Sequence, residues 1–273
     1  EPVIRDPENP KTLPEENQPV VFEHVSFRYP GAEQNILEDI NFTASPGETV
    51  AMIGSTGSGK STLIKILTGV LERTAGTILL NGREYVSYSP RDARRQGIST
   101  LFQELNVVDQ LTVEENLTLG MEDTTFGFLR KSTKIKKMVD ALKEIEPSID
   151  PKQKVKRLSV AKKQIVEIAK AVASGSDIII MDEPTASISE SEVKRLFRII
   201  RELKKNNVTV IYISHRLDEI FEIGDYVTVM RDGRHIATKP VSEVKDRSEL
   251  IRMMIGKTIV ESYIPKETQD QEV

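Results

Sequence analysis

Gly54-Ser55-Thr56-Gly57-Ser58-Gly59-Lys60-Ser61-Thr62 is the most informative segment of this chain. It follows residues 48–53, a short and mostly apolar run that predicts a buried strand, and it precedes an apolar segment that predicts a helix. Glycines at these spacings let backbone N–H groups turn inward around an anion, and the helix N-terminus adds the positive end of its dipole. The segment therefore predicts a phosphate-binding loop. Lys60 is expected to reach the β- and γ-phosphates of ATP, and Ser61 to bind Mg²⁺.

Two carboxylates follow a second predicted buried strand. The apolar run Ile178–Met181 ends at Asp182 and Glu183, and carboxylates at such a position are costly unless they bind something. Asp182 is placed to hold Mg²⁺ through water, and Glu183 is placed to polarise the water that attacks the γ-phosphate. Taken alone, the pair could equally belong to a solvated acidic loop, but the phosphate loop in the same chain favours the metal and water roles.

The order of the other segments predicts an α/β fold. Residues 20–28 are rich in β-branched and aromatic residues with partial alternation, as in an antiparallel strand, and residues 36–44 predict a second strand. The run Val208–Ile213 is largely apolar, as buried parallel strands are. Helical periodicity extends from Ser191 to Lys205, and residues 113–173 carry no strand signal, which predicts a mainly helical part.

Composition limits the possible partners. The 273 residues carry a formal net charge of -4, and the lysine-rich segments 131–137 and 152–157 have no interleaved aromatic residues, so nucleic acid is not an expected partner. The lack of cysteine excludes disulfides and thiolate zinc sites. No apolar run approaches the ~20 residues of a membrane-spanning helix. We therefore expect any membrane role to depend on a partner.

Over about residues 20–263 the chain resembles the nucleotide-binding domain of ABC transporters. The phosphate loop and the acidic pair stand where this family has its Walker A and Walker B motifs. Further landmarks follow in the family's order: the adenine-stacking aromatic Tyr29, the Q-loop glutamine Gln103, the signature at Leu158-Ser159-Val160-Ala161, the D-loop with Ser187 and Ser189, and the switch histidine His215. The resemblance implies an α/β P-loop NTPase fold with a RecA-like mixed sheet core, an N-terminal antiparallel β subdomain and an inserted α-helical signature subdomain.

The resemblance also implies a role for each landmark. Tyr29 and residues 54–62 would bind ATP, and Gln103 would contact both Mg²⁺ and the attacking water. The catalytic set would be Glu183, His215, Gln103 and Lys60, and the metal set would be Ser61, Gln103 and Asp182. Each landmark also has a simpler interpretation, since Tyr29 could be an edge-strand aromatic, Gln103 a surface amide and His215 a satisfied loop histidine. Their order along the chain favours the nucleotide site.

Two positions depart from the family pattern. The family signature is L-S-G-G-Q, whereas Val160-Ala161-Lys162 follow Leu158 and Ser159 here. A valine side chain stands where glycine lets the backbone approach the γ-phosphate held by a partner domain, so we expect a weakened contribution from this loop. Ser159 and the helix N-terminus could still donate, and Val160 and Ala161 could merely pack the helical part. In the D-loop, Ser189 stands where the family usually has aspartate.

The resemblance predicts partners as well as a ligand. Two ATPase domains are expected to close head to tail, each phosphate loop facing the other's signature, either as a homodimer or with another tandem half. Membrane subunits of a transporter are expected to hold the chain peripherally at the cytoplasmic face of the plasma membrane. Because a homodimer would carry two poor signatures, we expect ATP hydrolysis to be slow in isolation.

The domain organisation follows from the same patterns. Residues 1–19 carry five prolines and predict an extended linker, and residues 265–273 predict a frayed tail. Residues 20–264 form the ATPase domain, with 20–109 and 174–264 as core and β subdomain and about 110–173 as helical subdomain.

The two parts of the sequence resemble different subfamilies. From about residue 64 the chain is most similar to the first half of a tandem monosaccharide-importer ATPase, whereas the first ~62 residues resemble an exporter domain. This contrast suggests a mosaic, or else a divergent natural domain.

Other functions remain open on the sequence alone. A non-transport ABC ATPase would carry long coiled-coil or basic insertions, and none is seen. A nucleotide-binding module with little turnover is compatible with the altered signature. A P-loop kinase would transfer phosphate to an acceptor other than water, and the ordered landmarks argue against it.

Overall fold

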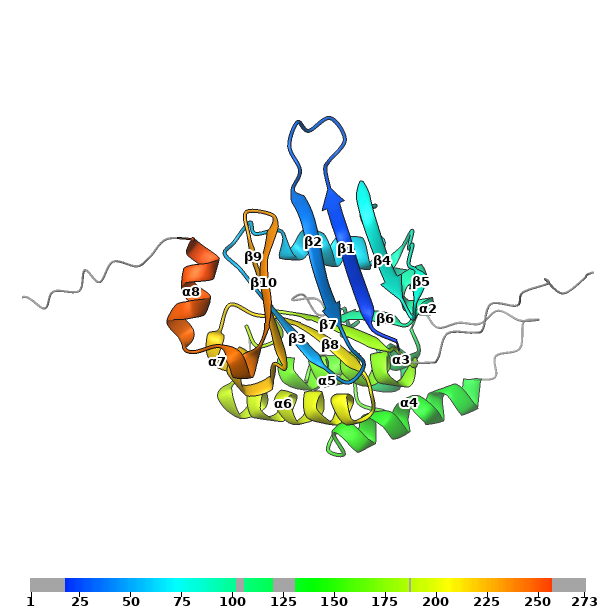
Figure 1. Cartoon of the computed structure of the whole chain (residues 1–273). Helices are drawn as coiled ribbons and strands as arrows, with labels where there is room; N and C mark the ends of the chain where they lie inside the picture. The colour runs from blue at the N-terminus through cyan, green and yellow to red at the C-terminus, as the bar shows by residue number, and fades with distance from the viewer. Residues whose placement is uncertain (1–17, 102–105, 120–130, 187, 257–273) are drawn as a thin grey trace, which may run out of the picture.

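The computed structural model describes residues 18–101, 106–119, 131–186 and 188–256 (Figure 1). Side chains are described throughout these ranges except at residues 131–134. Gln103, Ser187 and nearly all of the predicted linker and tail therefore lie outside the described residues. Within the described part, no helix is long and apolar enough to cross a membrane.

The strands form one mixed sheet of ten strands in the order β5-β4-β1-β2-β10-β9-β3-β8-β7-β6. The strands are β1 (Val20–Phe27), β2 (Leu37–Ala44), β3 (Thr49–Ile53), β4 (Ala75–Leu80), β5 (Arg83–Glu84), β6 (Ile98–Leu101), β7 (Ile178–Asp182), β8 (Thr209–Ile213), β9 (Tyr226–Arg231) and β10 (Arg234–Pro240). Strands β3, β8, β7 and β6 are parallel, and β1 pairs antiparallel with both β2 and β4. The parallel and antiparallel parts meet where Arg234 of β10 pairs with Glu38 of β2. The expected mixed core and antiparallel part are therefore joined in a single sheet.

The helices are distributed unevenly along the chain. They are α1 (Lys60–Leu67), α2 (Pro90–Arg95), α3 (Val113–Thr118), α4 (Lys131–Ile145), α5 (Val160–Ala173), α6 (Glu190–Lys205), α7 (Leu217–Ile223) and α8 (Arg247–Ile255), with short 3-10 turns η1 (Val155–Arg157) and η2 (Val241–Glu243). The described residues between β6 and β7 contain helices and one isolated bridge, between Thr112 and Lys154. A mainly helical segment lies at this place in the chain, as the missing strand signal indicates.

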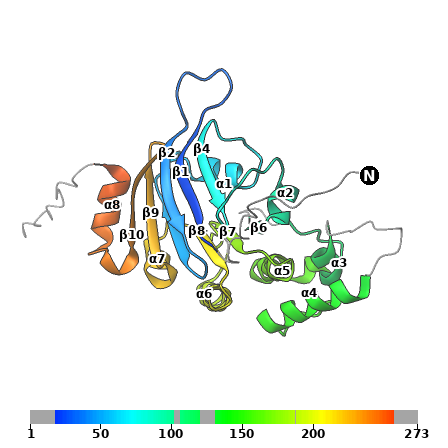
Figure 2. The ribbon, with the colours of Figure 1, turned by 45° about the vertical axis from the view of Figure 1, so that its right-hand side comes forward.

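Two hydrophobic clusters lie on the two faces of the parallel strands. In β3, Val50 and Met52 pack with α1, whereas Ala51 and Ile53 belong to the cluster that contains α5 and α6. Figure 2 shows α5 and α6 on one side of these strands and α1 on the other. Since successive side chains of a strand point to opposite faces, a strand buried on both faces must be apolar throughout. This explains the continuous apolar runs and places the carboxyl ends of these strands beside one another.

One strand and one helix of the fold carry little sequence signal. Strand β6 has only four residues, and its apolar Ile98 and Leu101 enclose the polar Ser99 and Thr100. Ser99 is buried because its Oγ lies 2.6 Å from the Oγ of Ser176 in the turn before β7. The preceding helix α2 begins at Ser89, whose side chain accepts a hydrogen bond from the backbone of Asp92. Neither element was predicted. Strand β6 was missed because the partner of Ser99 lies 77 residues away, whereas helix α2 has a local cap but only six residues.

Candidate functional site

The phosphate loop connects β3 to α1 and is fixed by close packing. Its last glycine, Gly59, caps α1 with φ 97°, a left-handed conformation that favours glycine. A Cβ atom at Gly54 would lie 2.4 Å from the carbonyl oxygen of Met230 and 2.4 Å from the Oγ of Ser58. A Cβ atom at Gly59 would lie 2.4 Å from a methyl group of Leu37. The loop therefore has no room for side chains at its first and last glycines.

Lys60 folds back over this loop. Its ammonium donates hydrogen bonds to the carbonyl oxygens of Gly54, at 2.8 Å, and Ser55, at 3.1 Å, and to the Oγ of Ser58, at 3.1 Å. Burial lowers the pKa of Lys60, and the nearby carboxylates of Glu183 and Asp182 oppose this shift. A cation is thus held inside a glycine-rich loop at a helix N-terminus, and both features attract anions.

The acidic pair stands at the end of β7, where Asp182 pairs with Ile213 of β8. Burial raises the pKa of Asp182, and the neighbouring Glu183 raises it further, whereas Lys60 lowers it. Glu183 has φ 47°, which is uncommon outside glycine, and its N–H donates to the carbonyl of Ile213 at 2.9 Å. Such a strained backbone persists where the surrounding structure holds it, and it is enriched at functional sites.

His215 lies against Glu183, with 3.3 Å between its Nδ1 and the Oε1 of Glu183. Both side chains are accessible, 64% for His215 and 30% for Glu183. Since β3, β8 and β7 are adjacent and parallel, the phosphate loop, His215 and the acidic pair emerge at one edge of the sheet. Ligands collect at the carboxyl ends of strands in such sheets. The structure therefore brings together three motifs that lie far apart in the sequence.

Tyr29 lies in the loop between β1 and β2 and does not follow one of the parallel strands. Its ring is 42% exposed and contacts the ring of Phe27 edge to face, with centroids 4.8 Å apart. A turn fixes its backbone, since the N–H of Ala32 donates to the carbonyl of Tyr29. Tyr29 thus presents an accessible aromatic surface, as an adenine-stacking residue must.

The signature segment forms the start of α5. Ser159 is the N-cap, and its Oγ accepts a hydrogen bond from the N–H of Lys162. Val160 is 40% exposed, whereas Leu158 and Ala161 are buried. Ala161 therefore packs in the helical part, and Ser159 and Val160 lie at an accessible helix N-terminus.

A hydrogen bond joins helix α5 to the segment that follows the acidic pair. The side-chain amide of Gln164 donates to the carbonyl oxygen of Pro184 at 2.7 Å, one residue after Glu183. The Oγ of Ser159 also lies 3.3 Å from the Oε1 of Glu192 in α6. These two contacts, which the sequence did not reveal, link the signature helix to the segments after β7.

Ser189 of the D-loop begins α6. Its N–H and Oγ both donate to the Oε2 of Glu192 at 2.9 Å. Ser189 is therefore the N-cap residue of α6, and its hydroxyl donates to Glu192, which an aspartate carboxylate could not do.

The described residues contain no group of three or more histidine, cysteine or carboxylate side chains that could hold a metal ion. The candidate ligands at the sheet edge are one hydroxyl, that of Ser61, and one carboxylate, that of Asp182. Such a set suits Mg²⁺, which binds through one or two carboxylates together with phosphate oxygens and water.

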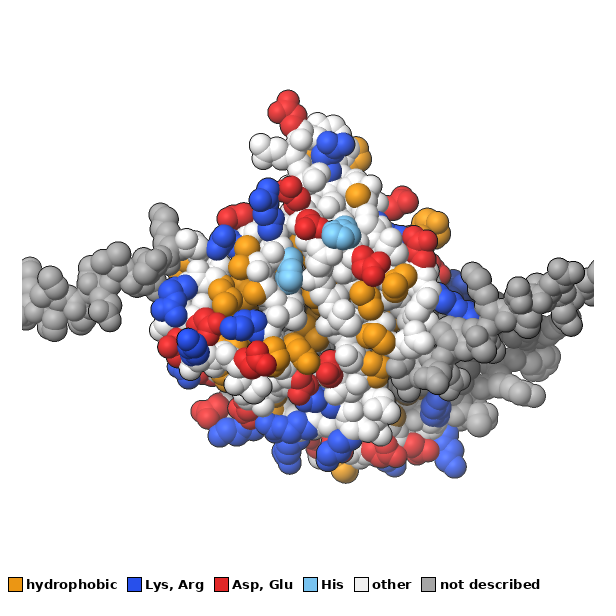
Figure 3. All heavy atoms as spheres, in the orientation of Figure 1, with side chains coloured by type: hydrophobic (Ala, Val, Ile, Leu, Met, Phe, Trp, Pro, Cys, Tyr) orange, Lys and Arg blue, Asp and Glu red, His pale blue; other side chains and the backbone are white. Residues whose placement is uncertain are grey.

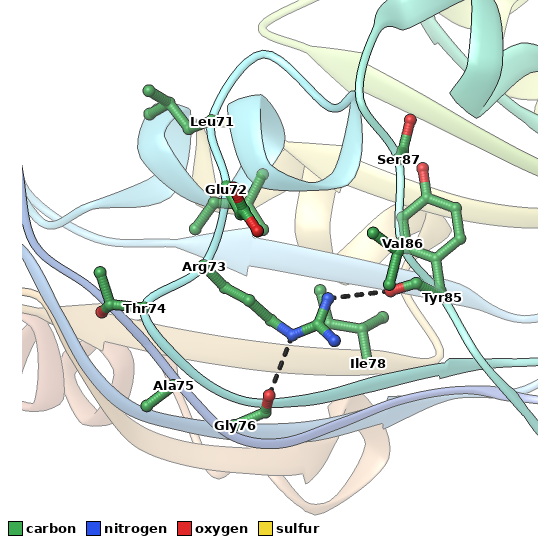
Figure 4. A pocket seen from close by; sticks show the side chains of 11 residues that line it. Leu71, Glu72, Arg73, Thr74, Ala75, Gly76, Ile78, Tyr85, Val86 and Ser87 are labelled. Atoms are coloured by element: carbon green, nitrogen blue, oxygen red, sulfur yellow. Dashed lines mark hydrogen bonds between the residues drawn. The ribbon is translucent and has the colours of Figure 1, made fainter.

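A pocket at the far end of α1 is occupied by an arginine (Figure 4). The guanidinium of Arg73 donates to the carbonyl oxygens of Gly76 and Tyr85 at 2.9 Å, and to Glu84. Burial raises the pKa of Tyr85 to about 12, and its hydroxyl donates to the carbonyl of Leu67. All these partners come from the protein itself, so this pocket is part of the scaffold.

Acidic and basic side chains are interspersed on the face of the molecule seen in Figure 3. That face shows no broad basic surface of the kind that binds a nucleic-acid backbone.

Comparison with known proteins agrees with the fold and with the family resemblance. The sequence profile of the ABC transporter family matches residues 37–186, more than half of the chain. A ribose import ATP-binding protein of Rubrobacter xylanophilus is 44% identical over 249 residues, which are 91% of this chain and 49% of the relative. One from Geobacillus kaustophilus is 44% identical over 84% of this chain and 46% of the relative. A galactose/methyl galactoside import ATP-binding protein of Fusobacterium nucleatum is 39% identical over 92% of this chain and 50% of the relative. The chain spans about half the length of these relatives.

Solved structures share the fold. An ATP-binding cassette of an ABC transporter in its ADP conformation superimposes with a TM-score of 0.76 at 26% identity, covering 87% of this chain and 98% of that one. A dimeric bacterial ABC transporter cassette gives a TM-score of 0.68 at 23% identity, with 81% of this chain and 98% of that one covered.

The mosaic hypothesis is not supported. Single relatives align over 84–92% of the chain, and so across the supposed junction near residue 62. The contrast between the two parts of the sequence therefore gives no reason to separate them.

Proposed function

Since this chain belongs to the ABC transporter family of ATP-binding domains, an ATPase family, we propose that it hydrolyses Mg²⁺-bound ATP at the sheet edge described above. The observation that carries the proposal is the convergence of the phosphate loop, the acidic pair and His215 at the ends of three adjacent parallel strands. Each motif alone has a simpler explanation. Those explanations do not account for all three motifs lying at the carboxyl ends of adjacent strands.

The residues divide the work by their chemistry. Backbone N–H groups of residues 54–62 surround the phosphates, Tyr29 stacks on the adenine, and Lys60 exchanges its loop carbonyls for β- and γ-phosphate oxygens. Ser61 and Asp182 would hold Mg²⁺, assisted by Gln103. The bound metal supplies charge stabilisation at the phosphates. Glu183 and His215 hold the attacking water in line with the γ-phosphate, so that catalysis is mostly positioning.

A second ATPase domain completes the site. The N-terminus of α5, with Ser159 exposed beside Val160, is available to cap a γ-phosphate held by a partner. The branched side chain of Val160 holds the backbone away from that phosphate, so we infer slow turnover in a homodimer. A nucleotide-binding module with little turnover is the second candidate function, and the same exposed Val160 favours it.

We further propose a transport role in sugar import. The relatives described above are named ribose and galactose/methyl galactoside import ATP-binding proteins. Such a role requires membrane subunits, which would hold the chain at the cytoplasmic face of the membrane and couple hydrolysis to transport.

Glu183→Gln tests the hydrolytic role directly. The variant keeps the size of the side chain but cannot polarise water as a base, so we expect MgATP affinity near wild type and a loss of turnover of about 100-fold or more. Glu222→Gln, which alters a surface pair with Arg201, is the matched control and should turn over like wild type. Undiminished hydrolysis by Glu183→Gln would remove Glu183 from this role, and absence of MgATP binding by the wild-type chain would remove the proposal itself.

A further inference from the structure

A buried carboxylate contacts residues that neighbour the exposed Glu183 and His215 in the sequence. Glu219, in the first turn of α7, is 3% exposed. A buried carboxylate is costly unless it is fully hydrogen-bonded, so its partners show what it does.

Three hydroxyl groups donate to this carboxylate, and the guanidinium of Arg216 forms an ion pair with it. Thr185 Oγ1 lies 2.7 Å and Arg216 Nη1 2.9 Å from Oε1. Tyr212 OH and Ser214 Oγ each lie 2.8 Å from Oε2. The hydroxyl donors are themselves buried, since Thr185, Tyr212 and Ser214 are all less than 5% exposed.

These partners come from both loops, the one that follows β7 and the one that follows β8. Thr185 follows β7 and stands two residues after Glu183, whereas Ser214 and Arg216 follow β8 and flank His215 on either side. The N–H of Arg216 also donates to the Oγ of Ser214 at 3.0 Å, which closes the second loop on itself. One carboxylate therefore joins the loop of Glu183 to the loop of His215.

The side chains of Glu183 and His215 are accessible and are not held by burial. His215 is 64% exposed, and Glu183 keeps an uncommon backbone conformation with φ 47°. Exposed side chains on loops lose precise placement unless buried contacts fix the loops. The backbone bond from Glu183 to Ile213 joins the two strand ends, and the contacts of Glu219 add a buried side-chain link between the two loops.

We propose that Glu219 is a positioning residue, which holds His215 and Glu183 in register across the two loops for hydrolysis. The inference rests on the proposed function of those two residues. The phosphate loop is held separately, by packing against Met230 and Leu37. Loss of Glu219 should therefore reduce turnover and leave ATP affinity intact.

Glu219→Gln is the first test, in the full chain. The amide retains one acceptor oxygen, so at least one of the three hydroxyl donors loses its acceptor, and the charge that pairs with Arg216 is gone. We expect kcat to fall about 10- to 100-fold, with the MgATP dissociation constant unchanged. Asp225→Asn is the matched control, because Asp225 accepts from Thr49 N and Lys204 Nζ away from the catalytic edge. It should keep the wild-type kcat whatever its stability.

A spectroscopic measurement separates positioning from general stability. The chain has three histidines, so the ring signals of His215 can be followed by NMR with His24 and His235 as internal references. Thr185→Val removes one hydroxyl donor on the other loop without changing its volume. We expect it to shift the His215 signals and to lower kcat by less than Glu219→Gln does, leaving His24 and His235 unchanged.

Each result of these experiments either supports the positioning role of Glu219 or overturns it. A wild-type kcat in Glu219→Gln, or His215 signals that neither variant shifts, would overturn the proposal, as would equal losses of kcat and ATP affinity. If Glu219→Gln does not fold, Thr185→Val decides by the same two readouts. If the wild-type chain has no ATPase activity, the proposed function fails, and the His215 signals still decide whether Glu219 couples the two loops.

Discussion

Gly54→Ala tests the claim that packing alone sets the shape of the phosphate loop. Gly54 does not have a positive φ, so alanine suits its backbone, and the only obstacle is space. The added Cβ would lie 2.4 Å from the carbonyl oxygen of Met230, a fixed backbone atom of β9. Because a comfortable C···O contact needs about 3.3–3.6 Å, the loop must move by about 1 Å.

Two losses follow from that displacement. Overpacking of this kind costs typically about 1–3 kcal/mol of unfolding free energy. A displacement of about 1 Å also moves the amides and Lys60 away from the phosphates, and misplacement of this size lowers kcat/KM by about 100-fold. Denaturant unfolding measures the first loss. Calorimetry with MgATP and a steady-state ATPase assay measure the second.

Gly224→Ala is the matched control for this experiment. Its Cβ would also meet a backbone oxygen, that of Ile220, at 2.8 Å, but at the end of α7 rather than in the loop. We expect both variants to lose stability and only Gly54→Ala to lose ATP affinity. If Gly54→Ala binds MgATP as wild type does, the loop adapts, and the packing argument is wrong.

Two further predictions concern stability. Burial raises the pKa of Glu167 to about 7, and its Oε2 has no hydrogen-bond partner among the described residues. Because the folded pKa exceeds the unfolded value of about 4.3, the stability contributed by protonated Glu167 is full below that pH and is lost as pH rises through 7. Urea unfolding should find Glu167→Gln equal to wild type near pH 4 and more stable by at most about 4 kcal/mol at pH 8, and parallel pH profiles would contradict this. Ser189→Ala should lose about 1 kcal/mol of unfolding free energy, because it removes the hydroxyl that donates to Glu192 at the start of α6. Ser189→Asp should not restore this hydrogen bond, because a carboxylate cannot donate to Glu192; a Ser189→Asp variant as stable as wild type in urea unfolding would contradict this.

Much of the fold could be predicted because its signals are local. The sequence predicts a helix from Ser191 and strands over residues 36–44 and 208–213, and the structure has α6 from Glu190 and strands over Leu37–Ala44 and Thr209–Ile213. These elements are buried on one or both faces, so their apolar periodicity is strong. Strand β6 lacked such a signal because its Ser99 is satisfied by Ser176, 77 residues away.

The residues of the candidate site likewise fall into those that have a local sequence signal and those that do not. The phosphate loop, the acidic pair and His215 could be found because each is a short motif with its own chemistry. Glu219 could not, because the hydrogen bond that matters joins it to Thr185, 34 residues earlier, and a glutamate in the first turn of a helix is ordinary. Gln164 was missed for the same reason, since its partner is a backbone carbonyl of another element. The roles of Gln103 and Ser187 remain predictions, because both lie outside the described residues.

The two halves of the site are held by different forces, and this has a functional consequence. The phosphate loop is fixed sterically, by the absence of room at Gly54 and Gly59 against β9 and β2. The pair of Glu183 and His215, whose proposed role is to position water, is linked by polar contacts through Glu219, and its side chains remain exposed. Steric contacts are short-ranged and independent of protonation, whereas a buried polar network weakens as a whole when one member is lost. Affinity for ATP and rate of hydrolysis should therefore be separable by mutation. An ATPase that must hold ATP until a second domain arrives needs this separation, because the nucleotide can be bound firmly while the hydrolytic geometry remains adjustable.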